Sequence, residues 1–254
     1  VQEFYQADLA NVSATTAIKT LRSLSALWNS WELSFGEHDS PPRSNPVKRI
    51  RSTQPKLIRK IAPRKSLLAE AHRRPWFDAA MARAEKLGEI NNSSPLALAA
   101  LFLTGARLSE ITRLQWDEVD FDACTIALPP SRTKTGVEHV RPITPRLEEI
   151  LRRRLAYNPK DCPFVFPAVR RSSKHDGPIP TGDPRKTINA INKAVGCSIT
   201  AHDLRRTFIA AATAERIPSV SIKLLVGHSI NTQTDEYAAA DREGLPGYAV
   251  QIED

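Results

Sequence analysis

A proline-rich, strongly basic segment divides the chain into two unequal parts. Between Ser40 and Ala69 the sequence contains five prolines and no acidic residue. Its nine positive charges are Arg43, Lys48, Arg49, Arg51, Lys56, Arg59, Lys60, Arg64 and Lys65. Because prolines at this density interrupt helices, residues 43–65 are predicted to form an extended linker between two domains, residues 1–42 and residues 66–254.

The charge of this linker indicates what the chain binds. The whole chain has a formal net charge of +8, so the nine linker cations exceed the net charge of the molecule. A polyanion such as double-stranded DNA is the predicted partner, with the linker cations and Arg132 following its phosphates. A solvated linker without DNA contacts is the alternative interpretation.

Composition excludes several other classes of protein. No apolar run reaches the length that crosses a membrane. The cysteines Cys124, Cys162 and Cys197 are far apart and lack the spacing of metal ligands. The sequence therefore predicts a cytoplasmic protein without a membrane partner, a bound metal or a cofactor.

Hydrophobic periodicity predicts a mainly helical fold. Residues 14–35 place apolar side chains at helical spacing, which predicts an amphipathic helix. Trp28 and Trp31 on this helix are predicted to pack in the core of the first domain. Beyond residue 66 most segments are helical in pattern, but two β-rich runs around a polar loop in residues 124–144 predict a hairpin. No amphipathic helix is predicted in residues 238–254. The predicted fold class is thus mainly α with a small antiparallel β-hairpin or sheet.

One tyrosine has surroundings that do not suit a packed side chain. In the stretch GHSINTQTDEYAAAD, Tyr237 has Gln233, Thr234, Glu236 and Ala238 as neighbours. A core tyrosine has leucine-like residues at helical spacing, so Tyr237 is predicted to be presented to a ligand. A phenol has a pKa of ~10, and as a nucleophile it needs proton removal or nearby cations.

Two arginines and two histidines supply groups of that kind. Arg107 begins a short helical run with Glu110 one turn later, His202 and Arg205 share a helix face, and His228 follows a helix-ending glycine. Two guanidinium groups can hold the non-bridging oxygens of a phosphodiester, and histidines titrate in the range that assists proton transfer. Taken singly, such residues are more often surface ion pairs or solvated helix faces.

The order of these residues resembles that of the tyrosine recombinases, the phage integrase family. The resemblance is carried by TGARLSEITRLQWDEVD, TKTGVEHVRPIT, HDLRRTF and VGHSINTQTDEY, and it covers residues 66–240. It implies the catalytic fold of that family. It also implies that residues 1–42 are the end of a helical core-binding domain and that the arm-type domain of full-length integrases is absent.

The resemblance implies how the phosphate is held. Arg107 and Arg205 would bind the scissile phosphate, His228 would support the phosphate or the nucleophile, and Glu110 would brace the site.

The resemblance also implies the covalent chemistry. Tyr237 would attack phosphorus to form a 3′-phosphotyrosyl bond, with His202 assisting proton transfer. Lys134 would protonate the 5′-oxygen leaving group, although Arg132 stands two positions away in the same loop. The reaction would need neither ATP nor a metal, because one phosphoester replaces another.

The predicted function is site-specific recombination of double-stranded DNA sites. By resemblance, the enzyme would act as a homotetramer on DNA, could be a monomer when free of DNA, and could work with accessory DNA-bending proteins. It would act in the bacterial nucleoid or a phage-infected cell. The alternatives are a type IB topoisomerase-like nicking-closing enzyme, an inactive DNA-binding or architectural protein, and a basic helical protein that binds no nucleic acid.

Overall fold

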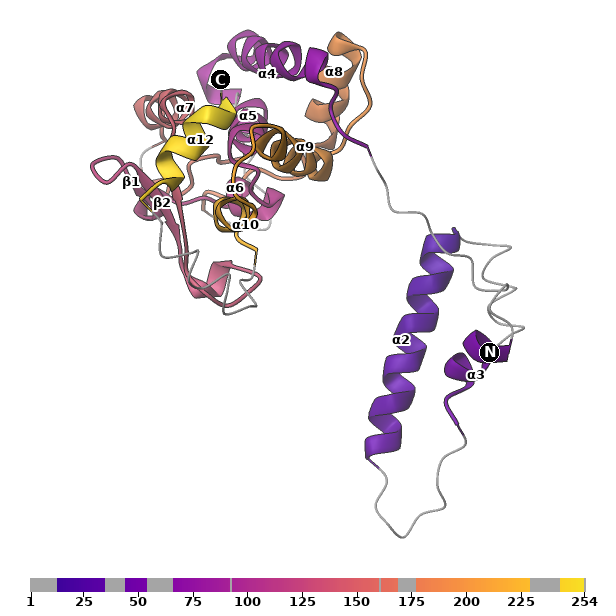
Figure 1. The fold of residues 1–254 in the computed structure, drawn as a ribbon. Helices are drawn as coiled ribbons and strands as arrows, with labels where there is room; N and C mark the ends of the chain where they lie inside the picture. The colour runs from indigo at the N-terminus through magenta and orange to yellow at the C-terminus, as the bar shows by residue number, and fades with distance from the viewer. Residues whose placement is uncertain are drawn as a thin grey trace. The chain divides into compact units, whose positions relative to one another are not determined.

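The chain forms two compact units, residues 1–65 and 66–254 (Figure 1). The structure is a computed structural model, and it describes residues 13–34, 44–53, 66–91, 93–159, 161–168, 177–228 and 243–253. Within these ranges, no helix combines the length and the apolar character that crossing a membrane requires.

The first unit is built on the predicted amphipathic helix. Helix α2, Ala14–Leu33, begins at Ser13, whose hydroxyl accepts a hydrogen bond from the Thr16 amide at 3.3 Å. Its buried residues Ile18 and Leu21 pack in a small cluster. Trp31 is 44% exposed, so its predicted place in the core is wrong, because this cluster extends along the helix only as far as Leu24.

A second helix lies inside the segment that was predicted to be an extended linker. Helix α3, Pro46–Thr53, begins with a proline, and proline is tolerated at the first helical position because its missing N–H has no partner there anyway. Asn45 caps the helix: its Oδ1 accepts hydrogen bonds from the amides of Val47 at 3.0 Å and Lys48 at 3.4 Å. The prediction of an extended chain is therefore wrong for residues 46–53.

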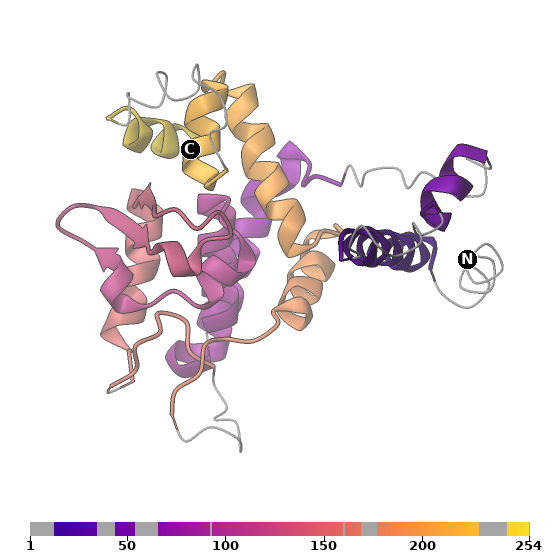
Figure 2. The ribbon, with the colours of Figure 1, turned by 90° about the horizontal axis from the view of Figure 1, so that it is seen from below.

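The second unit is mainly helical. Its elements are α4 Glu70–Asn91, α5 Ser93–Thr104, α6 Leu108–Thr112, η1 Trp116–Glu118, β1 Val119–Asp120, β2 Thr125–Leu128, η2 Pro130–Arg132, β3 His139–Pro142, α7 Pro145–Ala156, α8 Arg185–Val195, α9 Ala201–Ala214, α10 Ser219–Val226 and α12 Leu245–Glu253. Helix α5 is apolar on every side and lies at the centre, in contact with α4, α7, α8 and α9 (Figure 2). A helix that is apolar all round is expected to be surrounded by others, and here it forms the core of the unit.

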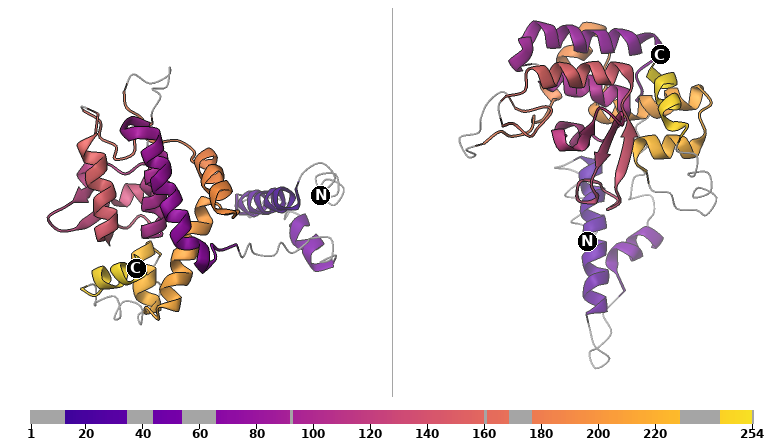
Figure 3. Two further views of the ribbon diagram at one scale, coloured as in Figure 1. Left: turned by 90° about the horizontal axis from the view of Figure 1, so that it is seen from above. Right: turned by 90° about the vertical axis from the view of Figure 1, so that its left-hand side faces the viewer.

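A small antiparallel sheet lies beside the helices. The predicted hairpin is confirmed as β2 and β3, and β1, which was not predicted, extends it to the order β1-β2-β3. Ile126 pairs with Arg141 and Leu128 pairs with His139 in the register. The connection between β2 and β3, residues 129–138, extends away from the helices (Figure 3).

The C-terminal segment contains a helix that the sequence did not predict. Helix α12 contacts α9 and α10, and its Leu245 and Ala249 are buried. Pro246 and Gly247 lie in its first turn, where they do little harm. The helix is also held at its other end, because Thr144 donates a hydrogen bond from its hydroxyl to Glu253 Oε1 at 2.8 Å.

Two hydrogen bonds attach the start of the second unit to α9. The Ser66 hydroxyl donates to Asp203 Oδ1 at 2.8 Å, and the Leu68 amide donates to Thr207 Oγ1 at 2.9 Å. The chain therefore enters this unit directly beside the first two turns of α9.

Gly105 provides a test of the packing between α5 and α9. Its φ is +57°, and a Cβ atom at this position would lie 2.5 Å from the Phe208 ring. Gly196 also has a positive φ, +75°, but open space around it. We expect Gly105→Ala to lower the free energy of unfolding by about 2–4 kcal/mol and Gly196→Ala by about 1 kcal/mol, measured by urea denaturation. Equal losses for both variants would contradict the close approach of Phe208.

Candidate active site

Arg205 is a buried cation at the junction of three helices. It lies on α9 with only 4% of its surface exposed. Its Nη1 donates hydrogen bonds to the carbonyl oxygens of Gly105 at 2.8 Å and Val226 at 2.7 Å. Burial, and then the nearby charge of Arg107, lower the pKa of Arg205 to about 10, so the guanidinium remains a cation at neutral pH.

Arg107 reaches the same place from a different element. It is the residue that precedes α6, and its Nη2 donates to the carbonyl oxygen of Gly227 at 3.1 Å. Arg205 and Arg107 thus bind consecutive carbonyls, Val226 and Gly227, at the C-terminal end of α10. The end of a helix carries partial negative charge, which favours two cations at this position.

Glu110 orients the Arg107 side chain. Its Oε1 accepts from Arg107 Nη1 at 2.8 Å, and its Oε2 accepts from the Arg107 amide at 3.0 Å. Burial alone would raise the pKa of Glu110, but the charge of Arg141 and the hydrogen bonds and charge of Arg107 outweigh burial and lower it. Glu110 is therefore an ionised carboxylate, as a brace between guanidinium groups requires.

Two residues of this cluster were missed by the sequence analysis. Arg141 Nη2 donates to Glu110 Oε2 at 3.0 Å and lies 3.4 Å from His139 Nε2. Both residues are on β3, within the stretch HVRPIT. Burial, and then the charge of Arg141, lower the pKa of His139 to about 4. His139 is therefore neutral near pH 7.

The cluster has more hydrogen-bond donors than acceptors. Arg205 Nη2 is buried and has no hydrogen-bond partner among the described residues. A buried donor without a partner is costly, and a cationic donor is best satisfied by an anion. With Glu110 already bound to Arg107 and Arg141, the site can accept a further anionic group such as a phosphate.

The two candidate histidines flank this cluster. Gly227 ends α10 in the left-handed conformation, and the following His228 amide donates to the Lys223 carbonyl at 2.9 Å. Burial, followed by the charges of Arg205 and Arg107, lowers the pKa of the partly exposed His228. His202 is exposed and lies in the first turn of α9, one turn before Arg205.

Lys134 lies on the connection between β2 and β3. It is exposed, and its loop is closed by a hydrogen bond from the Thr133 hydroxyl to the Val137 carbonyl at 2.7 Å. Arg132, in contrast, forms an ion pair with Glu118 at 2.9 Å. The structure thus presents the lysine to solvent and holds the arginine against the domain.

Several predicted residues lie outside the described ranges. Tyr237, the predicted nucleophile, belongs to residues 229–242. The linker cations Arg43, Lys56, Arg59, Lys60, Arg64 and Lys65 are also outside. Of the predicted DNA contacts in the linker, Lys48, Arg49 and Arg51 are described, and all three are exposed on α3.

A groove of about 890 Å³ adjoins the cluster. It is lined by α6, α8 and the start of α9, and its polar residues include Ser109, Arg113, Asn189 and His202. Of the candidate catalytic residues that the structure describes, His202 lines this groove, and it lies one turn before Arg205 on α9. Among the described residues, no group of three histidine, cysteine or acidic side chains is placed to hold a metal ion.

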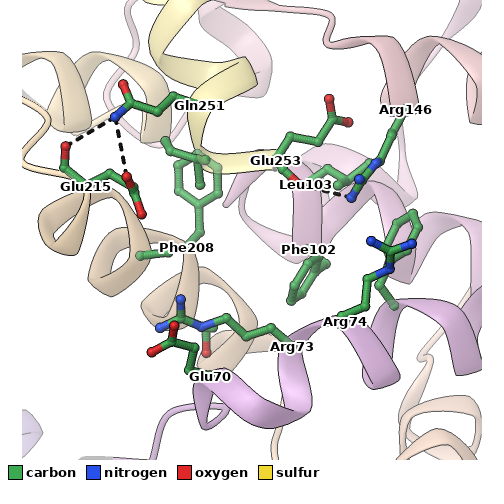
Figure 4. Close-up of a pocket in the computed structure, with 14 residues that line it drawn as sticks. Glu70, Arg73, Arg74, Phe102, Leu103, Arg146, Phe208, Glu215, Gln251 and Glu253 are labelled. Atoms are coloured by element: carbon green, nitrogen blue, oxygen red, sulfur yellow. Dashed lines mark hydrogen bonds between the residues drawn. The ribbon is translucent and has the colours of Figure 1, made fainter.

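A second cavity, of about 300 Å³, lies between α4, α5, α9 and α12 (Figure 4). Its walls include Phe102 and Phe208, with Arg73 and Arg146 at its edge. Gln251 donates to the Glu215 carbonyl at 3.4 Å across it. Among the described residues, none of the candidate catalytic side chains lines this cavity, so it is not part of the site.

A protein-family model matches most of this chain. The model of the phage integrase family matches residues 78–243, a range that includes Arg107, Arg205, His228 and Tyr237. The chain belongs to the phage integrase family.

Relatives within this family include integrases and recombinases. The prophage integrase IntF of Escherichia coli is 30% identical over 164 residues, which are 64% of this chain and 32% of IntF. The tyrosine recombinase XerA of Pyrococcus horikoshii is 26% identical over 155 residues, 61% of this chain and 53% of XerA. The chain thus matches about a third to a half of the length of these relatives.

Solved integrase structures share the fold. The lambda integrase tetramer bound to a Holliday junction superposes with a TM-score of 0.60 at 19% identity, covering 92% of this chain and 62% of the lambda chain. This similarity supports the predicted fold class, which the helices and the three-stranded antiparallel sheet confirm.

The pKa of His139 predicts how the stability of this phage integrase family member depends on pH. The folded protein has a His139 pKa of about 4, whereas an unfolded histidine has a pKa of ~6.5. Between these values the unfolded chain binds a proton that the folded protein does not. The free energy of unfolding should therefore fall as the pH drops from 7 to 4, by about 3 kcal/mol at most.

Urea denaturation of the parent and His139→Gln at several pH values tests this. The parent should lose more stability than the variant on acidification. The pKa of His228 is also lowered, but His228 is present in both proteins, so the difference between them gives the contribution of His139 alone. The same pH dependence in both proteins would contradict a neutral, partly buried His139.

Proposed function

We propose that the protein is a site-specific DNA recombinase that cleaves and rejoins strands through a 3′-phosphotyrosyl intermediate. The observation that carries the proposal is the pair of arginines bound to consecutive carbonyls of α10, with Arg205 Nη2 buried and unpaired among the described residues. Membership of the phage integrase family supports the same function.

This geometry supports binding of the scissile phosphate by the two arginines. Arg107 and Arg205 are anchored on one side by protein carbonyls, which leaves their remaining donors for phosphate oxygens. In the transition state the phosphorus gains a fifth oxygen and negative charge develops on the non-bridging oxygens. Donors that are fixed in advance stabilise that charge without reorganising, and His228 lies at the same helix end to contribute another.

The covalent step transfers one phosphoester bond to the protein. The Tyr237 oxygen forms a bond to phosphorus as the bond to the 5′-oxygen breaks. The phenol proton leaves with assistance from His202, and Lys134 donates a proton to the 5′-oxygen, which departs as a hydroxyl. Attack by another strand's 5′-hydroxyl reverses these steps. Because bond types are conserved, the reaction needs neither ATP nor a metal.

The substrate would be double-stranded DNA held by both units. The groove that contains Arg113 and Asn189 adjoins His202, and the exposed cations of α3 offer further phosphate contacts. Exchange between two duplexes needs four strand cleavages, so a homotetramer is the proposed active assembly. The lambda integrase tetramer on a Holliday junction supports this. The proposed location is the bacterial cytoplasm, where these DNA sites are found.

Replacement of Tyr237 tests the nucleophile. Incubation of the protein with nicked duplexes, which lose a short 5′-hydroxyl fragment on cleavage, should trap a covalent adduct visible by denaturing electrophoresis. Tyr237→Phe should form no adduct, because it lacks the attacking oxygen, while its DNA affinity stays within about twofold of the parent. Tyr157→Phe, at an exposed tyrosine, is the matched control and should retain adduct formation.

Two results would overturn the proposal. Normal adduct formation by Tyr237→Phe would show that another residue is the nucleophile. DNA binding without any adduct in the parent would favour an architectural protein. If an adduct forms, a two-duplex exchange assay separates recombination from the nicking and closing of one duplex.

The exposed cations of α3 generate a prediction about salt. Arg49→Gln combined with Arg51→Gln should weaken binding to all DNA sequences alike. If both arginines contact phosphates, the slope of log K against log salt should become shallower by roughly 0.9 per lost contact. The control replaces Lys19 and Arg22, exposed cations on α2, with glutamine. An identical salt slope in parent and test variant would show that α3 does not contact phosphate.

A further inference from the structure

Strand β3 carries two polar residues on its buried face. Arg141 is 2% exposed and pairs in the sheet with Ile126, and His139 pairs with Leu128. Ile126 and Leu128 are each 1% exposed, so this face belongs to the core. Burial of a guanidinium is costly unless it is paired and hydrogen-bonded. An arginine at this position therefore needs a specific partner.

The partner of Arg141 is the carboxylate that braces Arg107. Glu110 Oε2 accepts hydrogen bonds from both Arg141 Nη2 and the Arg107 amide, each at 3.0 Å. Its other oxygen accepts from Arg107 Nη1 at 2.8 Å. The carboxylate is thus fixed between the two guanidinium groups, and a shift of Arg141 would let Glu110, and with it Arg107, move.

His139 fills the space between Arg141 and the end of α10. Arginine has only donors, so the 3.4 Å approach of Arg141 Nη2 to His139 Nε2 requires a lone pair on that nitrogen. A Cβ atom at Gly227 would lie 3.1 Å from the His139 ring, which therefore packs closely on the backbone of Gly227. The Gly227 carbonyl is the one that binds Arg107. Both polar residues of β3 thus support groups that hold Arg107.

Strand β3 follows the loop that bears Lys134, the proposed proton donor to the 5′-oxygen. Lys134 lies on the β2–β3 connection, and β3 begins five residues later at His139. The ion pair between Arg141 and Glu110 therefore joins the hairpin that bears Lys134 to the helix that begins after Arg107. No other described ion pair links this hairpin to α6.

We propose that Arg141 is a positioning residue of the strand-cleavage reaction, which acts through Glu110 to orient Arg107 toward the scissile phosphate. The inference rests on the proposed function. Arg141, a buried residue of the hairpin, would thus take part in catalysis without contacting DNA. Misplacement of a reacting group by about 1 Å can cost on the order of 100-fold in rate.

Single-turnover cleavage of the nicked duplex tests the inference. Arg141→Met keeps the length of the side chain but removes its charge and donors, and it should slow adduct formation by about 10- to 100-fold. DNA affinity should stay within about threefold, because Arg141 is buried and does not reach the duplex. Arg141→Lys should recover part of the rate. Arg154→Met, at a buried arginine of α7 that is 1% exposed, is the control for loss of a buried cation and should cleave at the parental rate.

A double-mutant cycle identifies the route of the effect. If Arg141 acts through Glu110, then Arg141→Met should slow the Glu110→Gln variant much less than it slows the parent. Additive losses would indicate a direct electrostatic effect on the phosphate and would overturn the inference. Equal rates for Arg141→Met and the parent would overturn it as well.

The remaining outcomes are also decisive. Thermal unfolding of each variant is measured first, and if Arg141→Met is unfolded at the assay temperature the comparison uses Arg141→Lys, which keeps the charge. In that case Arg141→Lys should cleave more slowly than the parent at unchanged DNA affinity, and a loss of DNA affinity that accounts for the whole slowing would overturn the inference. If the parent itself forms no adduct, the proposed function fails, and this result is distinct from a parent that cleaves while its Arg141 variants are unaffected.

Discussion

The site depends on the hydrogen bonds between two arginines and the carbonyl oxygens at the C-terminal end of α10. Its last carbonyls bind Arg205 and Arg107, two cations that come from helices about 100 residues apart in the sequence and that would otherwise repel each other. The partial negative charge of a helix end offsets that repulsion. The left-handed Gly227 then ends the helix and places His228 beside the arginines. The same few backbone atoms thus position His228 and both arginines that are proposed to bind phosphate.

This arrangement couples catalysis to packing. Arg205 also binds the carbonyl of Gly105, where α5 ends against Phe208. Because α5 is the buried central helix of the unit, the position of the guanidinium is tied to the core. Arg107 is held from the opposite side by Glu110, which Arg141 links to the sheet. The proposed phosphate-binding donors are therefore held by protein groups in the absence of a ligand, as electrostatic stabilisation of a transition state requires.

Local sequence patterns predicted helix α2, a mainly helical second unit and the glycine that ends α10. The glycines that end α5, α8 and α10, and the arginine that precedes α6, could be recognised because caps are local. Proline was a less reliable guide, since Pro46 and Pro246 lie in first turns rather than between helices. Arg141 could not have been found from periodicity: strand alternation favours Val140 as the core residue, yet Val140 is 42% exposed. Only the distant Glu110 makes the buried position of the arginine acceptable.

The way the chain enters the second unit has a mechanical consequence. Ser66 and Leu68 are hydrogen-bonded to Asp203 and Thr207, and Asp203 is the residue whose carboxylate accepts from the Thr200 amide and hydroxyl at the start of α9. A force applied to the connecting segment is therefore transmitted first to the turn of α9 that bears His202, rather than to the periphery of the unit. A pull on Ser66 and Leu68 would therefore act directly on α9, which bears the proposed catalytic residues His202 and Arg205.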